Sequence, residues 1–124
     1  MSKRVFIAFA IEDKAKRDHL VYQAKLDHSP FEFVDMSVKE PWDEKWKTNC
    51  RERIKGCDGV VALISKNTAT ADGQLWEIKC AYDEKIPTML MWASDERPSV
   101  PSAIAGKLIN VWTWPNLKAF LDKL

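Results

Sequence analysis

Arg4-Val-Phe-Ile-Ala-Phe9 and Asp58-Gly-Val-Val-Ala-Leu-Ile-Ser65 are the stretches that decide the fold, because each is a nearly continuous apolar run. A strand with one face in water alternates apolar and polar side chains, whereas an unbroken run predicts a strand covered on both faces. Such strands are typical of the centre of a parallel sheet. We therefore expect Val5 to Phe9 and Val60 to Ile64 to form adjacent central strands.

The rest of the chain alternates between strand-like and helix-like patterns. Three further short runs predict strands, at Phe31–Asp35, Ile86–Trp92 and Leu108–Trp112. Apolar residues at helical spacing predict helices within residues 12–27, 41–56, 75–82 and 115–124. With right-handed crossovers, this order predicts an α/β, flavodoxin-like fold, a five-stranded parallel sheet of order 2-1-3-4-5 with helices on both faces. The length of 124 residues predicts a single domain over residues 1–124.

The composition argues against several kinds of partner. The formal net charge is +1 and no dense run of Lys and Arg is present, so we expect no nucleic-acid partner. The apolar run Val5–Ala10 is too short to cross a membrane or to act as a secretory signal, so we expect no membrane partner. The three cysteines form no Cys-x-x-Cys motif and predict reduced thiols in a cytoplasmic protein. His19 and His28 do not form a metal-ligand pattern, so we expect no metal site.

The fold predicts where a ligand would bind. In flavodoxin-like sheets, ligands bind at the carboxyl ends of the strands, where the strand order reverses. The first and third strands flank this point. Phe9, Ala10 and Ile11 after the first strand and Ser65 after the third are therefore candidate substrate-binding residues, together with the start of the third helix.

The usual ligands of this fold do not suit these residues. Glu12 and Asp13 follow the first strand, and two acids repel a phosphate, which argues against a flavin. We expect this pair to begin a helix. A phosphorylatable receiver domain would have an acceptor aspartate after the third strand, but this strand ends at Ser65. With only 4 glycines and no Gly-x-Gly-x-x-Gly or Walker motif, a glycine-based nucleotide cradle is excluded.

Four segments resemble the TIR and TIR-like domain family. Lys3–Phe9 is similar to the opening box of that family, a basic residue before a strand that ends in Phe, and Val60–Ser65 resembles its third strand. Leu75–Ala81 resembles the helix that carries the family's glutamate, and Lys85–Leu90 resembles the strand that follows it. The short TIR-like group that includes the Thoeris anti-phage proteins is the most similar.

This resemblance implies an activity. Catalytic TIR domains cleave the bond between nicotinamide and ribose in NAD, and some make ADP-ribose-type signals. NAD is then a substrate, and no cofactor is implied. The family's essential glutamate corresponds to Glu77, which would contact the ribose and stabilise the positive charge that develops on it. We also expect a downstream effector protein as partner. Because Trp76 lies off the apolar stripe of its helix, we expect a homo-oligomer in the active state, with Trp76 or the helix surface near it in the contact.

Glu77 and Trp76 each have a plainer interpretation. A glutamate near a helix start is favoured by the helix dipole and needs no catalytic role. Glu77 is expected at the edge of the apolar face of its helix, with Gly73 and Ala81 one turn away on either side and hence no ion pair. Trp76 is expected to be exposed and to contact a ligand or partner, and the alternative is a loop that folds over it. TIR enzymes often have a Trp several residues before the glutamate, whereas Trp76 is adjacent to it and points about 100° away.

Three further candidates for substrate binding also have structural alternatives. Asp35, after the second strand, would bind a ribose hydroxyl or form a turn. Trp42 would line the crevice or pack in the core with Trp46. Ser65 would contact a phosphate or ribose, or form a local cap.

Two functions of other kinds remain open beside NAD cleavage. One is a TIR-like module without catalysis, which binds a nucleotide or a protein. The other is an enzyme similar to nucleoside deoxyribosyltransferases, which use a similar fold and a glutamate.

Overall fold

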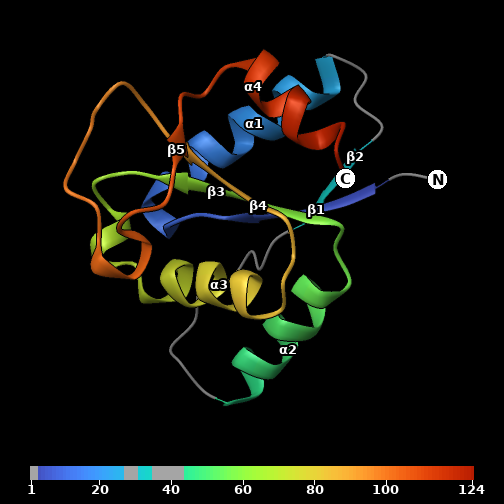
Figure 1. The fold of residues 1–124 in the computed structure, drawn as a ribbon, viewed down its shortest axis with the longest axis vertical. Coiled ribbons are helices and arrows are strands. Elements are labelled where there is room, and N and C mark those ends of the chain that lie inside the picture. The colour runs from blue at the N-terminus through green and yellow to red at the C-terminus, as the bar shows by residue number, and fades with distance from the viewer. Residues whose placement is uncertain (1–2, 27–30, 35–43) are drawn as a thin grey trace.

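A computed structural model describes residues 3–26, 31–34 and 44–124 of the chain (Figure 1). Its strands are β1 (Lys3–Ala8), β2 (Phe31–Val34), β3 (Gly59–Ile64), β4 (Thr88–Trp92) and β5 (Ile109–Asn110). Its α-helices are α1 (Lys14–Leu26), α2 (Glu44–Lys55), α3 (Asp72–Asp83) and α4 (Trp114–Leu121). Short 3-10 helices are η1 (Ile11–Asp13), η2 (Thr68–Thr70) and η3 (Ser102–Ile104).

The five strands form one parallel sheet in the order β2-β1-β3-β4-β5. β1 and β3 are adjacent, with Phe6 opposite Val60 and Ala8 opposite Ala62. Every residue of β3 is buried, as its unbroken apolar run predicts. The predicted fold, strand order and central pair are confirmed.

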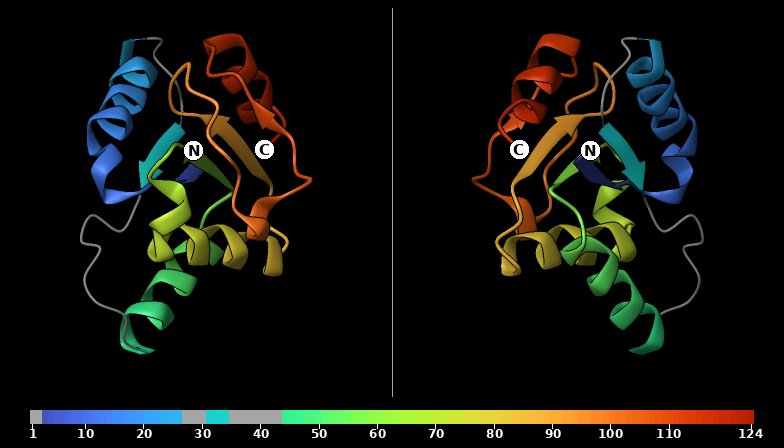
Figure 2. Two further views of the ribbon diagram at one scale, coloured as in Figure 1. Left: turned by 90° about the vertical axis from the view of Figure 1, so that its left-hand side faces the viewer. Right: turned by 90° about the vertical axis from the view of Figure 1, so that its right-hand side faces the viewer.

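Two helical layers cover the sheet, as Figure 2 shows from two sides. Successive side chains of a strand point to opposite faces. Val5 and Ile7 of β1 therefore pack in one cluster with Leu20 of α1 and Leu117 of α4. Phe6 and Ala8 of β1 pack in the other cluster, which contains residues of α2 and α3. The core thus has an α1/α4 side and an α2/α3 side, separated by the sheet.

The element boundaries differ from the sequence prediction mainly at the edge of the sheet. β5 is only the pair Ile109–Asn110, whereas we expected a strand from Leu108 to Trp112. Leu108 and Val111 are exposed by 78% and 51%, so their apolar character does not reflect a place in the core. An edge strand pairs on one side only, and two residues suffice to continue the sheet beyond β4.

Candidate functional site

A side chain from α3 joins the carboxyl ends of β1 and β3. Gln74 is buried, and its Nε2 donates hydrogen bonds to the carbonyl oxygens of Ala8 at 3.1 Å and Leu63 at 2.6 Å. These bonds hold the first turn of α3 against the two strands that flank the reversal of strand order. Gln74 was not among the predicted site residues. Its only available signal was a position three residues before Glu77, which places the two side chains on one helix face.

A second connection between the same strand ends begins at Asp13 in η1. Its Oδ2 accepts a hydrogen bond from Ser65 Oγ at 2.5 Å, and its Oδ1 accepts one from Asn67 Nδ2 at 2.9 Å. Ser65 Oγ also accepts from the backbone N–H of Asn67 at 3.0 Å. We expected Asp13 only to begin a helix. The buried Asp13 also connects the segments that follow β1 and β3. The Ser65 hydroxyl has partners within the protein, which favours the interpretation of Ser65 as a local cap.

Glu77 is completely buried on α3, with 0% of its surface exposed. Its Oε2 accepts a weak hydrogen bond from Cys50 Sγ of α2 at 3.9 Å. The expectation that Glu77 lies at the edge of the apolar face is wrong. The buried face of α3 contains Gln74, Glu77, Ile78, Cys80 and Ala81, so the carboxylate lies at the interface of α2 and α3.

Trp76 is half-buried and packs between α3 and α2, so the expectation of an exposed side chain is also wrong. Its ring makes an edge contact with Trp46, with 5.7 Å between the centroids. The Arg51 guanidinium lies over the Trp76 ring at 5.4 Å and also forms an ion pair with Glu84 at 2.5 Å. The hydrogen bond from Arg51 to Glu84 raises the pKa of the Arg51 guanidinium further. These contacts hold α2 to α3 directly beside Glu77.

Two of the three cysteines have thiols whose pKa is raised, which disfavours a reactive thiolate there. Cys50, Cys57 and Cys80 are all buried and form no disulfide. Burial raises the pKa of the Cys57 thiol to about 11. Burial also raises the pKa of Cys80, although the nearby Arg51 acts in the opposite direction. Within residues 3–26, 31–34 and 44–124, no group of three or more His, Cys, Asp or Glu is placed to hold a metal ion. The candidate reactive group is therefore the Glu77 carboxylate.

The other predicted site residues are not gathered around Glu77. Phe9 and Ala10 are buried, and Phe9 packs on the α1/α4 side of the core, across the sheet from α3. Ile11 is exposed by 48%. Asp35 and Trp42 lie outside the described residues. The structure thus brings together Glu77, Trp76 and Cys50, and it places Ser65 in a separate network with Asp13.

The architecture defines the class of protein. The crystal structure of the TIR domain of the Toll-related receptor TRR-2 from Hydra magnipapillata is similar, with a TM-score of 0.69. The match covers 95% of this chain and 97% of that chain, at 13% sequence identity. An identity this low shows a shared TIR fold. A search of the curated proteins finds no significant match.

The sequence defines the family more closely. The sequence model of the family described as "Thoeris protein ThsB, TIR-like domain" matches residues 6–98. The chain belongs to this family, and it is a TIR-like domain of the Thoeris type, which serves anti-phage defence. The predicted resemblance is thereby confirmed. No helix in the described part of the chain is long and apolar enough to cross a membrane.

Proposed function

We propose that this TIR-like domain cleaves the nicotinamide–ribose bond of NAD to make an ADP-ribose-type immune signal for a separate effector protein, with Glu77 as the catalytic residue. The observation that carries the proposal is the complete burial of the Glu77 carboxylate between α2 and α3. Burying a charged group destabilises a fold, and such groups are concentrated at functional sites. Glu77 also corresponds to the essential glutamate of the TIR enzymes that this chain resembles.

The chemistry needs one well-placed carboxylate and no general acid. When the C–N bond breaks, its electron pair leaves with nicotinamide, which departs as a neutral molecule because its ring nitrogen was cationic. Positive charge develops on the ribose, and an adjacent carboxylate stabilises it. A water molecule or a hydroxyl group of the substrate then adds to the sugar carbon and loses its proton. NAD is the substrate, and no other cofactor takes part.

Because Glu77 has no exposed surface, a substrate reaches it only after a local opening, which we place at the contact between α2 and α3. Among the described side chains of α2, Cys50 and Ile54 are the buried ones, and Trp46 is half-buried. An element with so few buried side chains can separate locally from its neighbour at a small free-energy cost. We therefore include a shift of α2 in the proposal, with the Arg51 contacts to Trp76 and Glu84 as the interactions that must be released.

The same burial favours a second candidate function. A carboxylate with no exposed surface is compatible with a domain that signals through binding and performs no catalysis. In that case Glu77 would contribute to the α2–α3 interface alone. The two functions differ in one observable, the fate of NAD.

The experiment that separates them is incubation of concentrated protein with NAD. Chromatography measures the nicotinamide released, and calorimetry on the same preparation measures NAD binding. Release of nicotinamide supports the enzyme. Binding of NAD, with full recovery of the dinucleotide at every protein concentration, supports the module without catalysis.

We further propose that the active form is a homo-oligomer that uses the outer surface of α3. Leu75 and Trp76 are both half-exposed and line a shallow cavity of about 400 Å³ with Lys47, Asp72, Lys79 and Ala103. Leu75→Ala is expected to lower the mass measured by light scattering at high concentration, because apolar anchors contribute strongly to interfaces. Trp76→Ala should do the same, although it also removes the contact with Trp46. Identical masses for wild type and Leu75→Ala at all concentrations would contradict this interface.

A further inference from the structure

Two adjoining cavities lie across the sheet from Glu77, beside α1. The larger, of about 460 Å³, lies between α1 and the segments after β4 and β5, and His19 and Trp112 are among its lining residues. The smaller, of about 180 Å³, lies against Asp13 and the segment after β3 that includes Lys66. Lys16, Ala93 and Ser94 line both cavities. The hollow therefore reaches the carboxyl ends of β1, β3 and β4, where ligands of this fold class bind.

The larger cavity contains two aromatic rings held in a defined orientation. His19 and Trp112 lie with their centroids 5.5 Å apart and their planes at 65°. Trp112 Nε1 donates a hydrogen bond to Gln23 Oε1 at 3.0 Å, which fixes the indole. The Trp112 side chain is half-buried, and both rings line the cavity. Such a pair offers a surface against which a flat heteroaromatic base can pack.

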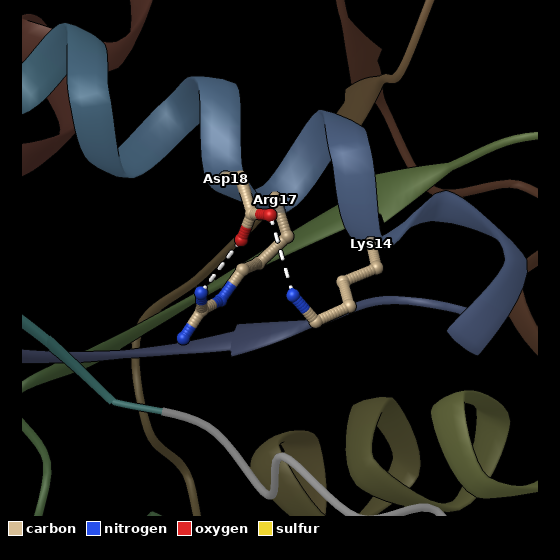
Figure 3. A network of polar contacts seen from close by, with 3 residues as sticks. All are labelled: Lys14, Arg17 and Asp18. Carbon is tan, nitrogen blue, oxygen red and sulfur yellow. Dashed lines mark hydrogen bonds and ion pairs between the residues drawn. The ribbon is translucent and has the colours of Figure 1, made fainter.

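Lys16 is the cation of the first turns of α1 that remains available to a ligand. Its neighbours Lys14 and Arg17 both contact Asp18 (Figure 3). The distances are 3.3 Å from Lys14 and 2.8 Å from Arg17. The hydrogen bond from Arg17 lowers the pKa of the Asp18 carboxyl, so this side chain stays ionised and keeps its partners. Lys16 lines the hollow and forms no ion pair with any residue that the structure describes.

Lys66 and Ser94 add to the donors around Lys16. Lys66 lines the smaller cavity, and it too has no ion-pair partner in the described part of the chain. Ser94 Oγ accepts a hydrogen bond from the backbone N–H of Glu96 at 3.3 Å, which leaves its hydroxyl hydrogen to be donated. Two ammonium groups and a hydroxyl are suitable donors for a phosphate. Asp13 and Glu96 also line the smaller cavity. The repulsion expected from Asp13 is reduced because its two oxygens already accept hydrogen bonds from Ser65 and Asn67. Asp95 lines the larger cavity, where a carboxylate can accept hydrogen bonds from ribose hydroxyls.

We propose that this hollow is a second ligand site, which binds a nucleoside monophosphate. The base packs against Trp112 and His19, the ribose hydroxyls bond to Asp95, and the phosphate lies between Lys16 and Lys66. The volume of the larger cavity falls within the range of small-molecule sites. Because the sheet separates α1 from α3, a nucleotide held here does not contact Glu77. The ligand of this site is therefore distinct from the molecule that is cleaved.

The test uses AMP as the probe, with calorimetry for affinity and NMR for the indole N–H signal of Trp112, assigned with Trp112→Phe. Wild type is expected to bind AMP and to shift the Trp112 signal. Lys16→Glu and His19→Ala should each weaken binding by about ten-fold or more. Lys25→Glu makes the same charge change at an exposed position of α1 that does not line the hollow, so it should bind AMP like wild type. Glu77→Gln should also bind like wild type.

Four outcomes would overturn the site. One is the absence of heat and of a Trp112 shift up to about 5 mM AMP. Another is equal affinity of wild type, Lys16→Glu and His19→Ala. A third is adenosine binding as tightly as AMP, because the phosphate would then add nothing to the affinity and the role assigned to Lys16 and Lys66 would be wrong. A loss of AMP binding in Glu77→Gln as large as that in Lys16→Glu would place the nucleotide on the other face of the sheet.

Discussion

Glu77→Gln is expected to lower the rate of nicotinamide release from NAD by about 100-fold or more, because a preorganised charge that stabilises the transition state is lost. Glutamine keeps the size of the side chain and an oxygen that can accept the bond from Cys50. The change therefore removes the negative charge with little change of shape. The measurement is the initial rate of nicotinamide release at equal protein concentration.

The matched control is Glu52→Gln, the same substitution at an exposed position of α2. It should cleave NAD at the wild-type rate. Because Glu77 is buried, circular dichroism and a urea melt must show that Glu77→Gln is folded. If a folded Glu77→Gln protein cleaves NAD as fast as wild type, Glu77 is not the catalytic residue.

Gln74→Leu is expected to lower the free energy of unfolding by about 2 kcal/mol. Leucine fills a similar volume but cannot donate to the carbonyl oxygens of Ala8 and Leu63, which lose these bonds at buried positions. The loss is partly offset, since Gln74 Oε1 is itself buried without a hydrogen-bond partner in the described part of the chain. Urea unfolding measures the change. NAD cleavage should fall as well, because Gln74 positions the turn of α3 that precedes Glu77.

Lys25→Leu serves as the control for this change, since it introduces the same side chain at an exposed position of α1. Its effect on the free energy of unfolding should stay within about 0.5 kcal/mol, as is usual for surface positions. If the two variants unfold at the same urea concentration, the bonds from Gln74 do not hold α3 to the ends of β1 and β3.

The sheet was predictable because its signal is local and strong. The unbroken apolar runs at Val5–Ala8 and Val60–Ile64 leave no face for water, and only the centre of a parallel sheet accepts that pattern. The alternation of strands with helices then leaves few topologies. The short β5 was less predictable, since a pair of edge residues has hardly any pattern of its own.

The environment of Glu77 was not predictable from apolar spacing. Gln74, Glu77, Ile78 and Ala81 follow a helical period, but half of these residues are polar. The apolar residues alone pointed to Leu75, Ile78, Ala81 and Tyr82. Ile78 and Ala81 are buried, but Leu75 and Tyr82 are only half-buried. A prediction that counts only hydrophobic residues does not detect a buried helix face that includes polar side chains.

The connection of Asp13 to Ser65 was hidden for a different reason. The two residues are 52 positions apart and meet only because β1 and β3 are adjacent. The same holds for Trp76, whose position beside Trp46 depends on how α2 packs against α3. Contacts of this kind follow from the tertiary structure and have no local signature.

The most direct test of the central claim is the number of nicotinamide molecules released per protein chain, with NAD in excess and at concentrations where light scattering shows association. Our account predicts release well beyond one equivalent by wild type, matched by an equal amount of ADP-ribose-type product, and almost none by Glu77→Gln. Recovery of all the NAD intact, from a wild-type protein that calorimetry shows to bind it, would contradict the account.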